Sequence, residues 1–233
     1  MNFTPASPVS IGAFVLILIF VIGFYSAGTF IASRRLGGPA LKRALLVLAG
    51  ILAWNALLAI PVVTGWISAA VMPRLMLFFL AANLAAVIFA FSAPGVWLSR
   101  GLPIWALVAF QGFRLPLELI LHSWGEQGTI PMSMTWSGSN FDVITGIASL
   151  ALAPFAVRSA AAAWMANLIG FALLLNVGRV AVLSSPLPFA WGVEPPLQLV
   201  LYLPYAWIGP VCVAGALAGH VILTRALLSK GVH

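Results

Sequence analysis

The chain of 233 residues is 63% hydrophobic and 6% charged, with a net charge of +7 and a mean hydropathy of +1.12. A water-soluble domain carries about 25% charged residues, so this composition excludes a soluble globular protein. The basic residues are scattered among short connecting segments and form no basic stripe with interleaved aromatic residues, which argues against a nucleic-acid partner. The single cysteine, Cys212, excludes an internal disulfide, and we interpret it as a packing residue.

Seven continuous apolar stretches predict seven transmembrane helices, because a helix needs about 20 apolar residues to cross a bilayer. The first stretch has no basic residue before it and is longer than the apolar region of a signal peptide, so we interpret it as a retained span. We therefore expect residues 1–233 to form a single all-α domain, an integral membrane bundle of seven transmembrane helices. The predicted spans are 10–32, 44–64, 74–93, 103–123, 141–157, 161–183 and 197–224.

The distribution of basic residues predicts the orientation of the bundle. If the chain crosses seven times, eight basic residues lie on one side and only Arg74 lies at a span end on the other. Lysines and arginines near span ends stay on the cytoplasmic side, so we expect a bacterial inner membrane, with the N-terminus outside and the C-terminus inside. The eight residues are Arg34, Arg35, Lys42, Arg43, Arg100, Arg158, Arg225 and Lys230.

The predicted span 141–157 is the weakest of the seven, since it begins beside Asp142 and contains Pro154 near its end. If it were re-entrant, Arg158 would change sides and the one-sided pattern of basic residues would be broken. We therefore interpret it as a crossing.

The fourth span carries ionisable residues on one helical face. Arg114, Glu118 and His122 follow each other at intervals of four residues, which places them on a single stripe. Because this span runs from the inside outward, Arg114 is expected near mid-membrane and His122 at the outer edge. Such groups are costly in a membrane, and they usually face the bundle interior and pair. Pro116 predicts a kink between Arg114 and Glu118.

The next two spans carry polar residues that we expect to meet this stripe. Asp142 is expected at the outer end of the fifth span, at the depth of His122, and Asn176 with Arg179 in the outer half of the sixth. Two charge pairings are open, Arg114 with Glu118 and Arg179 with Asp142, or the reverse. The predicted cluster comprises Arg114, Glu118, His122, Asn140, Asp142, Asn176 and Arg179.

Other residues with possible chemistry are assigned packing roles. We interpret His220 in the seventh span as a lone interior or interface histidine. Met132 and Met134 are suited to a soft metal such as Cu(I), but we favour loop packing and leave a metal site undecided. No cofactor is predicted. Retinal is excluded because Lys42 and Lys230 lie outside the spans, and a haem held by two histidines is excluded because His122 and His220 are expected at opposite depths and His233 is terminal.

The second half of the chain, from Phe113 to Arg225, resembles a family of uncharacterised bacterial polytopic membrane proteins with seven spans. The resemblance implies that Arg114, Glu118, Asn140, Asp142 and Arg179 belong to the family's pattern, and it implies no activity. The family has a glutamate-glycine-arginine run before Asn-Phe-Asp, where this chain has Ser137-Gly138-Ser139. The runs that carry the resemblance are FRLPLELILH (113–122), GTIPMSMTWSGSNFDVITGI (128–147), NVGRV (176–180) and YLPYAWIGP (202–210), with His220 after them.

We expect a binding or sensing module with an outward-facing polar pocket for a small ligand or ion. The cavity is expected to be closed on the inner side of Arg114 by Leu107 and Phe110. One alternative is a transporter or proton-conducting protein that uses Glu118, His122 and Asp142. Another is a structural subunit of a membrane assembly. The partners would be the lipid bilayer, a second copy or another membrane protein. An enzyme with His122 or a carboxylate as general base is disfavoured, since the chain has no nucleophile elbow, HExxH motif or phosphate-binding glycine loop.

Overall fold

The computed structural model describes residues 3–67 and 72–230, so the middle of the loop 64–73 and His233 lie outside the described residues. Within the described chain the regular structure is helical. Six helical segments are long and apolar enough to cross a membrane, which defines a multi-pass membrane protein by length and composition. They are Pro8–Arg35, Ala40–Val63, Arg74–Phe91, Ile104–Glu126, Ala160–Ser184 and Tyr205–Ser229.

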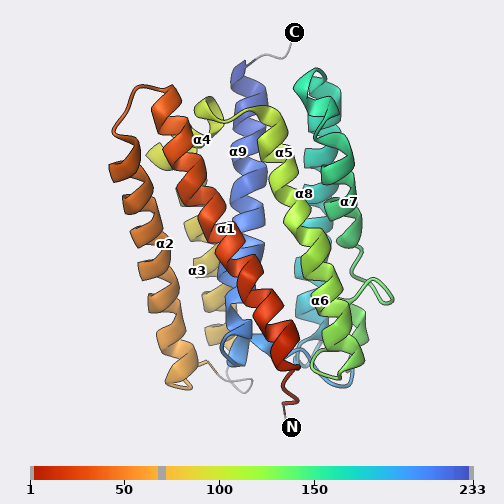
Figure 1. Ribbon diagram of the computed structural model, residues 1–233. Coiled ribbons are helices and arrows are strands. Elements are labelled where there is room, and N and C mark those ends of the chain that lie inside the picture. The colour runs from red at the N-terminus through yellow and green to blue at the C-terminus, as the bar shows by residue number, and fades with distance from the viewer. Residues whose placement is uncertain (1–2, 68–71, 231–233) are drawn as a thin grey trace.

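The helices run roughly parallel and antiparallel to one bundle axis (Figure 1). We call the end where α1 begins the lower end and the end where α9 ends the upper end, as they lie in Figure 1. The α-helices are α1 (Pro8–Arg35), α2 (Ala40–Val63), α3 (Met72–Phe91), α4 (Ala93–Gly101), α5 (Ile104–Phe110), α6 (Arg114–Glu126), α7 (Val143–Leu152), α8 (Ala160–Ser184) and α9 (Ala214–Lys230).

Local sequence explains where the long helices begin. Ser7 caps α1 by accepting a hydrogen bond from the backbone N–H of Ser10 at 3.4 Å, and Pro8 occupies the first turn, where no intrahelical N–H is needed. Ser159 caps α8 in the same way, with the backbone N–H of Ala162 at 3.2 Å. Both helices then run through predominantly apolar sequence.

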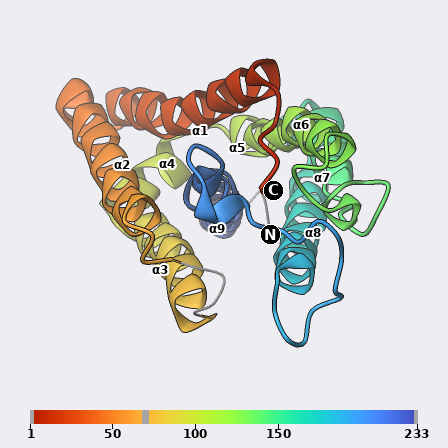
Figure 2. The same cartoon turned by 90° about the horizontal axis from the view of Figure 1, so that it is seen from below.

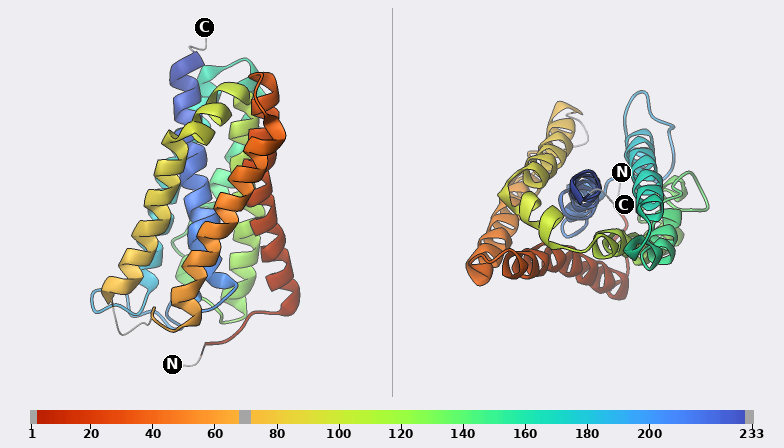
Figure 3. Two further views of the ribbon diagram at one scale, coloured as in Figure 1. Left: turned by 90° about the vertical axis from the view of Figure 1, so that its left-hand side faces the viewer. Right: turned by 90° about the horizontal axis from the view of Figure 1, so that it is seen from above.

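Helix α9 occupies the centre of the bundle, and the other helices are arranged around it except between α3 and α8 (Figures 2 and 3). It packs against α3, α4, α5 and α8. Its first half is rich in glycine and alanine, and a Cβ on Gly219 would lie 2.9 Å from the ring of Phe110. These small residues let the surrounding helices approach α9 closely.

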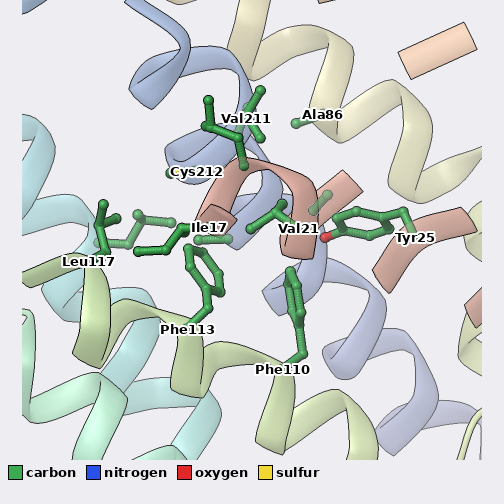
Figure 4. Close-up of a cluster of buried hydrophobic side chains, with 14 of the residues drawn as sticks. Ile17, Val21, Tyr25, Ala86, Phe110, Phe113, Leu117, Val211 and Cys212 are labelled. Carbon is green, nitrogen blue, oxygen red and sulfur yellow. The ribbon is translucent and has the colours of Figure 1, made fainter. Parts of the chain in front are cut away.

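An apolar core joins α1, the α5–α6 segment and the start of α9. Figure 4 shows the side chains of Phe110, Phe113 and Leu117 gathered with Ile17 and Val21 of α1. The rings of Phe110 and Phe113 lie 5.2 Å apart, a normal distance for an aromatic pair. This core fixes the height of the α5–α6 segment, which carries the ionisable stripe.

The predicted fourth span, 103–123, corresponds to a helical segment with an irregular turn. A 3-10 turn, η1 (Gln111–Phe113), separates α5 from α6. Pro116 lacks an N–H, so the carbonyl of Gly112 loses its usual helical partner, and η1 includes this residue. The irregularity that Pro116 predicts thus lies one turn before the proline.

The predicted fifth span, 141–157, differs from the structure. Its helix, α7, has ten residues and extends about 15 Å, which is too short to cross a bilayer alone. It begins at about mid-height of the bundle (Figure 1). Asp142, which precedes α7, therefore lies at mid-height and not at the outer end. The chain from Gln127 to Asp142 is largely non-helical apart from the 3-10 turn η2 (Met132–Met134).

The predicted seventh span, 197–224, begins too early. Residues 199–208 form two 3-10 turns, η4 (Leu199–Leu201) and η5 (Tyr205–Ile208), and a π-helical turn, η6 (Gly209–Val213), precedes α9. The segment long enough to cross a membrane is Tyr205–Ser229. His220 therefore lies near the middle of this helix, whereas the predicted boundaries placed it close to the inner end.

Candidate functional site

Arg114 is the centre of a buried polar cluster at mid-height, and its side chain is almost completely enclosed. Its Nε and Nη2 groups both engage the carboxylate of Asp142, so the pair is bidentate. Its Nη1 donates to the backbone carbonyl of Gly170 at 2.9 Å and lies 3.2 Å from Nε2 of His220. One guanidinium thus ties α6 to the start of α7, to α8 and to α9.

The start of α7 holds Asp142 in place for this pairing. The hydroxyl of Thr145 donates to Oδ1 of Asp142 at 2.9 Å, and the backbone N–H of Asp142 donates to Oδ1 of Asn140 at 3.1 Å. Gly146 permits the close approach of α7 to α6, since a Cβ there would lie 2.4 Å from the backbone nitrogen of Leu115. A short helix and a glycine therefore bring an acid from a non-helical segment to the middle of the bundle.

Glu118 lies one turn below Arg114, and its carboxylate has a different environment. The amide nitrogen of Asn140 donates to both carboxylate oxygens, at 2.9 and 3.0 Å, and to the carbonyl of Met134 at 3.0 Å. The amide oxygen of Asn140 accepts from the backbone of Asp142, which fixes the orientation of the amide. Within the described part of the chain, Asn140 is the one hydrogen-bond donor to Glu118. The side chain of Glu118 is nevertheless buried.

A hydrogen-bonded chain continues from Arg114 towards the upper end. Thr224 donates to the backbone carbonyl of His220, so its oxygen accepts from the amide nitrogen of Asn167 at 2.7 Å. The amide oxygen of Asn167 must then accept from Nδ1 of His220 at 2.8 Å. It follows that His220 carries its proton on Nδ1 and accepts from Arg114 through Nε2, and the ring is neutral.

Sequence reasoning missed the part of the cluster formed by His220, Asn167 and Thr224. His220 is not a lone interior histidine, because both of its ring nitrogens have partners. Gly170 makes room for the imidazole, since a Cβ there would lie 2.5 Å from Cε1 of His220. Correct helix bounds would have indicated the contact. With the last crossing helix at Tyr205–Ser229, His220 and Arg114 both lie near the middle of their helical segments and so at a similar depth.

His122 does not join the buried cluster. It lies towards the lower end, where its ring stacks on Trp136 with 4.0 Å between ring centroids. Its Nε2 is 3.6 Å from Oε1 of Glu126, a side chain that is 66% exposed. Because α7 begins at mid-height, Asp142 is well above His122, and the predicted common depth of the two residues is wrong.

Asn176 and Arg179 also lie outside the buried cluster. Asn176 donates to the backbone carbonyl of Ser139 at 2.8 Å, which ties α8 to the non-helical segment. Arg179 is exposed, donates to the amide oxygen of Asn176 at 2.9 Å and stands over the ring of Trp191 at 5.8 Å. Of the two predicted pairings, the structure therefore has Arg114 with Asp142, and Arg179 pairs with neither acid.

A groove in the lower half of the bundle leads to the cluster. It has a volume of about 490 Å³ and lies between α3 and α8, with α6 and the η4–η6 segment at its base. Its walls are predominantly apolar side chains, and Arg114, Glu118 and Asp142 are the charged residues that line it. Met76 and Leu80 on α3 and Val182 on α8 are exposed and also line the groove, so the groove opens sideways between these helices.

Leu107 and Phe110 were predicted to close the cavity on the inner side of Arg114. Both side chains are buried, and neither lines the groove. The side of Arg114 towards the upper end is nevertheless not purely apolar, because the chain of His220, Asn167 and Thr224 lies there. Arg114 and Asp142 line the groove, whereas His220, Asn167 and Thr224 do not.

In the described part of the chain the usual metal ligands do not gather at one point. Within residues 3–67 and 72–230, no group of three or more histidine, cysteine, aspartate and glutamate side chains is placed to hold an ion. Met134 is buried in the apolar core, and Met132 packs against Gly125, where a Cβ would lie 2.8 Å from its sulfur. The two methionines thus have the packing contacts expected from the sequence.

Comparison with protein families, curated proteins and solved structures finds no match for this chain. The resemblance to an uncharacterised family of seven-span proteins therefore stays a prediction.

Proposed function

We propose that the protein is a membrane-embedded binding module for an amphiphilic molecule, whose apolar part occupies the lower groove and whose head group contacts Glu118. The head group would be a cation, such as an amine, or a hydrogen-bond donor. The observation that carries this proposal is the environment of Glu118, a buried carboxylate with a single donor at the inner end of an apolar groove.

The charge balance of the cluster supports a cationic or donating head group. When ionised, Arg114, Asp142 and Glu118 sum to one negative charge, since His220 is neutral. Arg114 is already paired with Asp142. A buried charge without a partner costs several kcal/mol, so Glu118 needs either a proton or a positive ligand. A molecule that supplies the charge or the donor at this point would be held specifically.

The groove explains why the molecule would be amphiphilic and not a small polar ion. Its walls come from α3, α6, α8 and the η4–η6 segment and are predominantly apolar. Gly178 of α8 lines it, and a Cβ at this position would meet no atom within 4 Å. The opening between α3 and α8 faces the side of the bundle that lipid covers in a multi-pass protein. An apolar chain could enter from the bilayer without passing through water.

We also propose that the chain crosses a bacterial inner membrane seven times, with the lower end outside. The non-helical segment 127–142 together with α7 would form the fifth crossing. Non-helical backbone at membrane depth is tolerated where protein covers it, and Asn140 is completely buried. The basic residues at the ends of α1, α4 and η3 lie towards the upper end, which would then be cytoplasmic.

A reporter fused after His233 would be cytoplasmic, and a tag before Met1 would be labelled from outside. Labelling of both ends from one side would contradict this topology.

The alternative of proton conduction gains one supporting observation and meets one obstacle. The hydrogen-bonded chain from Glu118 to Thr224 extends into the upper half, which favours a conducting path. However, Arg114 lies between Glu118 and His220, and an arginine keeps its charge and accepts no hydrogen bond. A proton therefore cannot be handed along the chain through Arg114.

The proposal is tested by photolabelling in lipid nanodiscs with a long-chain primary amine that carries a diazirine in its alkyl chain. Labelled peptides are then mapped by mass spectrometry. Wild type should be labelled on α3 and α8 along the groove, and Glu118→Gln should lose most of this labelling. Glu126→Gln, which removes an exposed carboxylate at the same end, is the matched control and should label as wild type does.

A second pair of variants tests the groove independently of the charge. Gly178→Phe should fill the groove and abolish labelling, whereas Gly23→Phe adds the same side chain at an open position on α1, away from the groove. Neither substitution should disturb its helix, because phenylalanine has a higher helix propensity than the glycine it replaces. Equal labelling of all four variants, or labels that lie outside α3, α6, α8 and the η4–η6 segment, would overturn the proposal.

A further inference from the structure

A second cavity lies in the upper half of the bundle, on the opposite side of α3 from the lower groove. It has a volume of about 460 Å³ and is enclosed by α1, α2, α3, α4 and α9. Figure 3 shows α9 between α2 and α3 in the left view, on the side where this cavity lies. Leu46 lines the cavity and is 62% exposed, so the cavity opens towards the surface along α2.

The walls of the upper cavity are predominantly apolar. The hydroxyl of Tyr25 donates to the carbonyl of Gly215 at 2.5 Å, and the amide of Asn55 donates to the carbonyl of Ile51 at 2.9 Å. Trp54 and Phe89 add aromatic surface. The space therefore suits a hydrocarbon chain better than a polar solute.

Arg43, in the first turn of α2, is the charged residue that lines the cavity. Its guanidinium lies over the ring of Trp97 with 4.2 Å to the centroid. It also rests against Gly38, where a Cβ would lie 2.1 Å from Nη1. These two contacts hold the guanidinium at the upper mouth of the cavity.

Among residues 3–67 and 72–230, Arg43 has no acidic partner. The chain has four acidic residues, Glu118, Glu126, Asp142 and Glu194. In the described part of the structure the ion pairs join Arg114 to Asp142 and His122 to Glu126. Further basic residues, among them Arg35 and Arg100, stand at the ends of neighbouring helices. A positive site to which the described residues supply no counterion, above an apolar cavity, fits an anion that carries a hydrocarbon chain.

We infer that the upper cavity binds an anionic phospholipid, with one acyl chain between α2 and α3 and the phosphate on Arg43. Basic pockets between membrane helices bind anionic lipid head groups, and a guanidinium suits a phosphate because it donates two parallel hydrogen bonds. This inference does not rest on the proposed function of the lower groove.

The test is native mass spectrometry of the full chain in detergent, titrated with dioleoylphosphatidylglycerol or dioleoylphosphatidylcholine. Wild type should bind the anionic phosphatidylglycerol more tightly than the zwitterionic phosphatidylcholine. Arg43→Gln should weaken its binding about tenfold, the size expected for a lost charge-assisted hydrogen bond. Arg100→Gln removes a charge at the same end without touching the cavity and should change binding less than twofold.

A second variant tests the acyl chain. Gly50 lines the cavity, and a Cβ on it would meet no atom within 4 Å. The phenylalanine of Gly50→Phe should therefore fill the cavity and weaken the binding of both lipids. Gly23→Phe on α1 is the control and should bind as wild type does. Equal losses for Arg43→Gln and Arg100→Gln, or unchanged binding in Gly50→Phe, would overturn the inference.

Discussion

Arg114 and Glu118 are one helical turn apart on the same face of α6, yet their surroundings differ. Arg114 is held by side chains and backbone from three other segments, and its charge is paired with Asp142. Glu118 has one neutral donor, Asn140, and lines an apolar groove. The comparison separates a structural half of the cluster, centred on Arg114, from a half suited to a ligand, centred on Glu118.

The two halves of the cluster favour different functional alternatives, a structural subunit and a binding module. The structural alternative explains Arg114, Asp142 and His220, because these groups satisfy one another and join four segments. It does not explain the charge of Glu118, since a neutral donor such as Asn140 could join the two segments without a buried carboxylate and its desolvation cost. The proposed binding role would account for that cost, because a ligand would supply the missing charge or donor.

The largest expected effect concerns the Arg114–Asp142 pair. Arg114→Leu or Asp142→Leu alone should lower the free energy of unfolding by about 3–5 kcal/mol, because each leaves a buried charge unpaired. The double variant should recover part of this loss. Unfolding in mixed micelles measures the three values as a double-mutant cycle. The double variant Arg114→Leu with Glu118→Leu is the control and should recover less of the free energy of unfolding. If it recovered more than Arg114→Leu with Asp142→Leu does, Arg114 would be paired with Glu118 and not with Asp142.

A smaller effect is expected at His220, whose ring accepts from Arg114 and donates to Asn167. His220→Leu should cost about 1–3 kcal/mol, because it leaves buried polar groups on both residues without a partner. His220→Gln offers both an acceptor and a donor and should cost less. The two variants are compared by unfolding in the same micelles. Equal losses would mean that His220 contributes by packing alone and that its hydrogen bonds are not part of the structural half.

The smallest effect on stability is expected at Glu118. Glu118→Gln keeps an oxygen that accepts from Asn140 and removes the unpaired charge, so the free energy of unfolding should change by less than about 1 kcal/mol. Asp142→Asn is the matched change in the structural half and should cost several times more. A large loss in Glu118→Gln would mean that Glu118 is structural too.

The sequence was sufficient to predict the helical membrane class and the inward face of α6. The interval of four residues fixes Arg114 and Glu118 on one stripe wherever the helix ends, so that prediction did not depend on boundaries. Asn140 and Asp142 follow in the chain and join the same cluster. Depth was harder to predict, because it requires knowing where each helix begins.

Two boundary errors account for most of the differences at the site. Counting residues 141–157 as a full helix placed Asp142 at the outer end, whereas α7 covers only Val143–Leu152. Starting the last span at 197 placed His220 near the inner end, because 3-10 and π turns are apolar and resemble helix in a hydropathy pattern. Arg179 lies near the lower end of α8, where a long basic side chain can extend to the interface.

An experimental structure of the protein in a lipid nanodisc tests the difference between the two halves most directly. It should contain elongated density in the lower groove between α3 and α8, ending within hydrogen-bonding distance of Glu118, while Arg114 stays paired with Asp142. A structure in which α3 lies against α8 and closes the groove, or in which Glu118 pairs with Arg114, would contradict the assignment of Glu118 to a ligand.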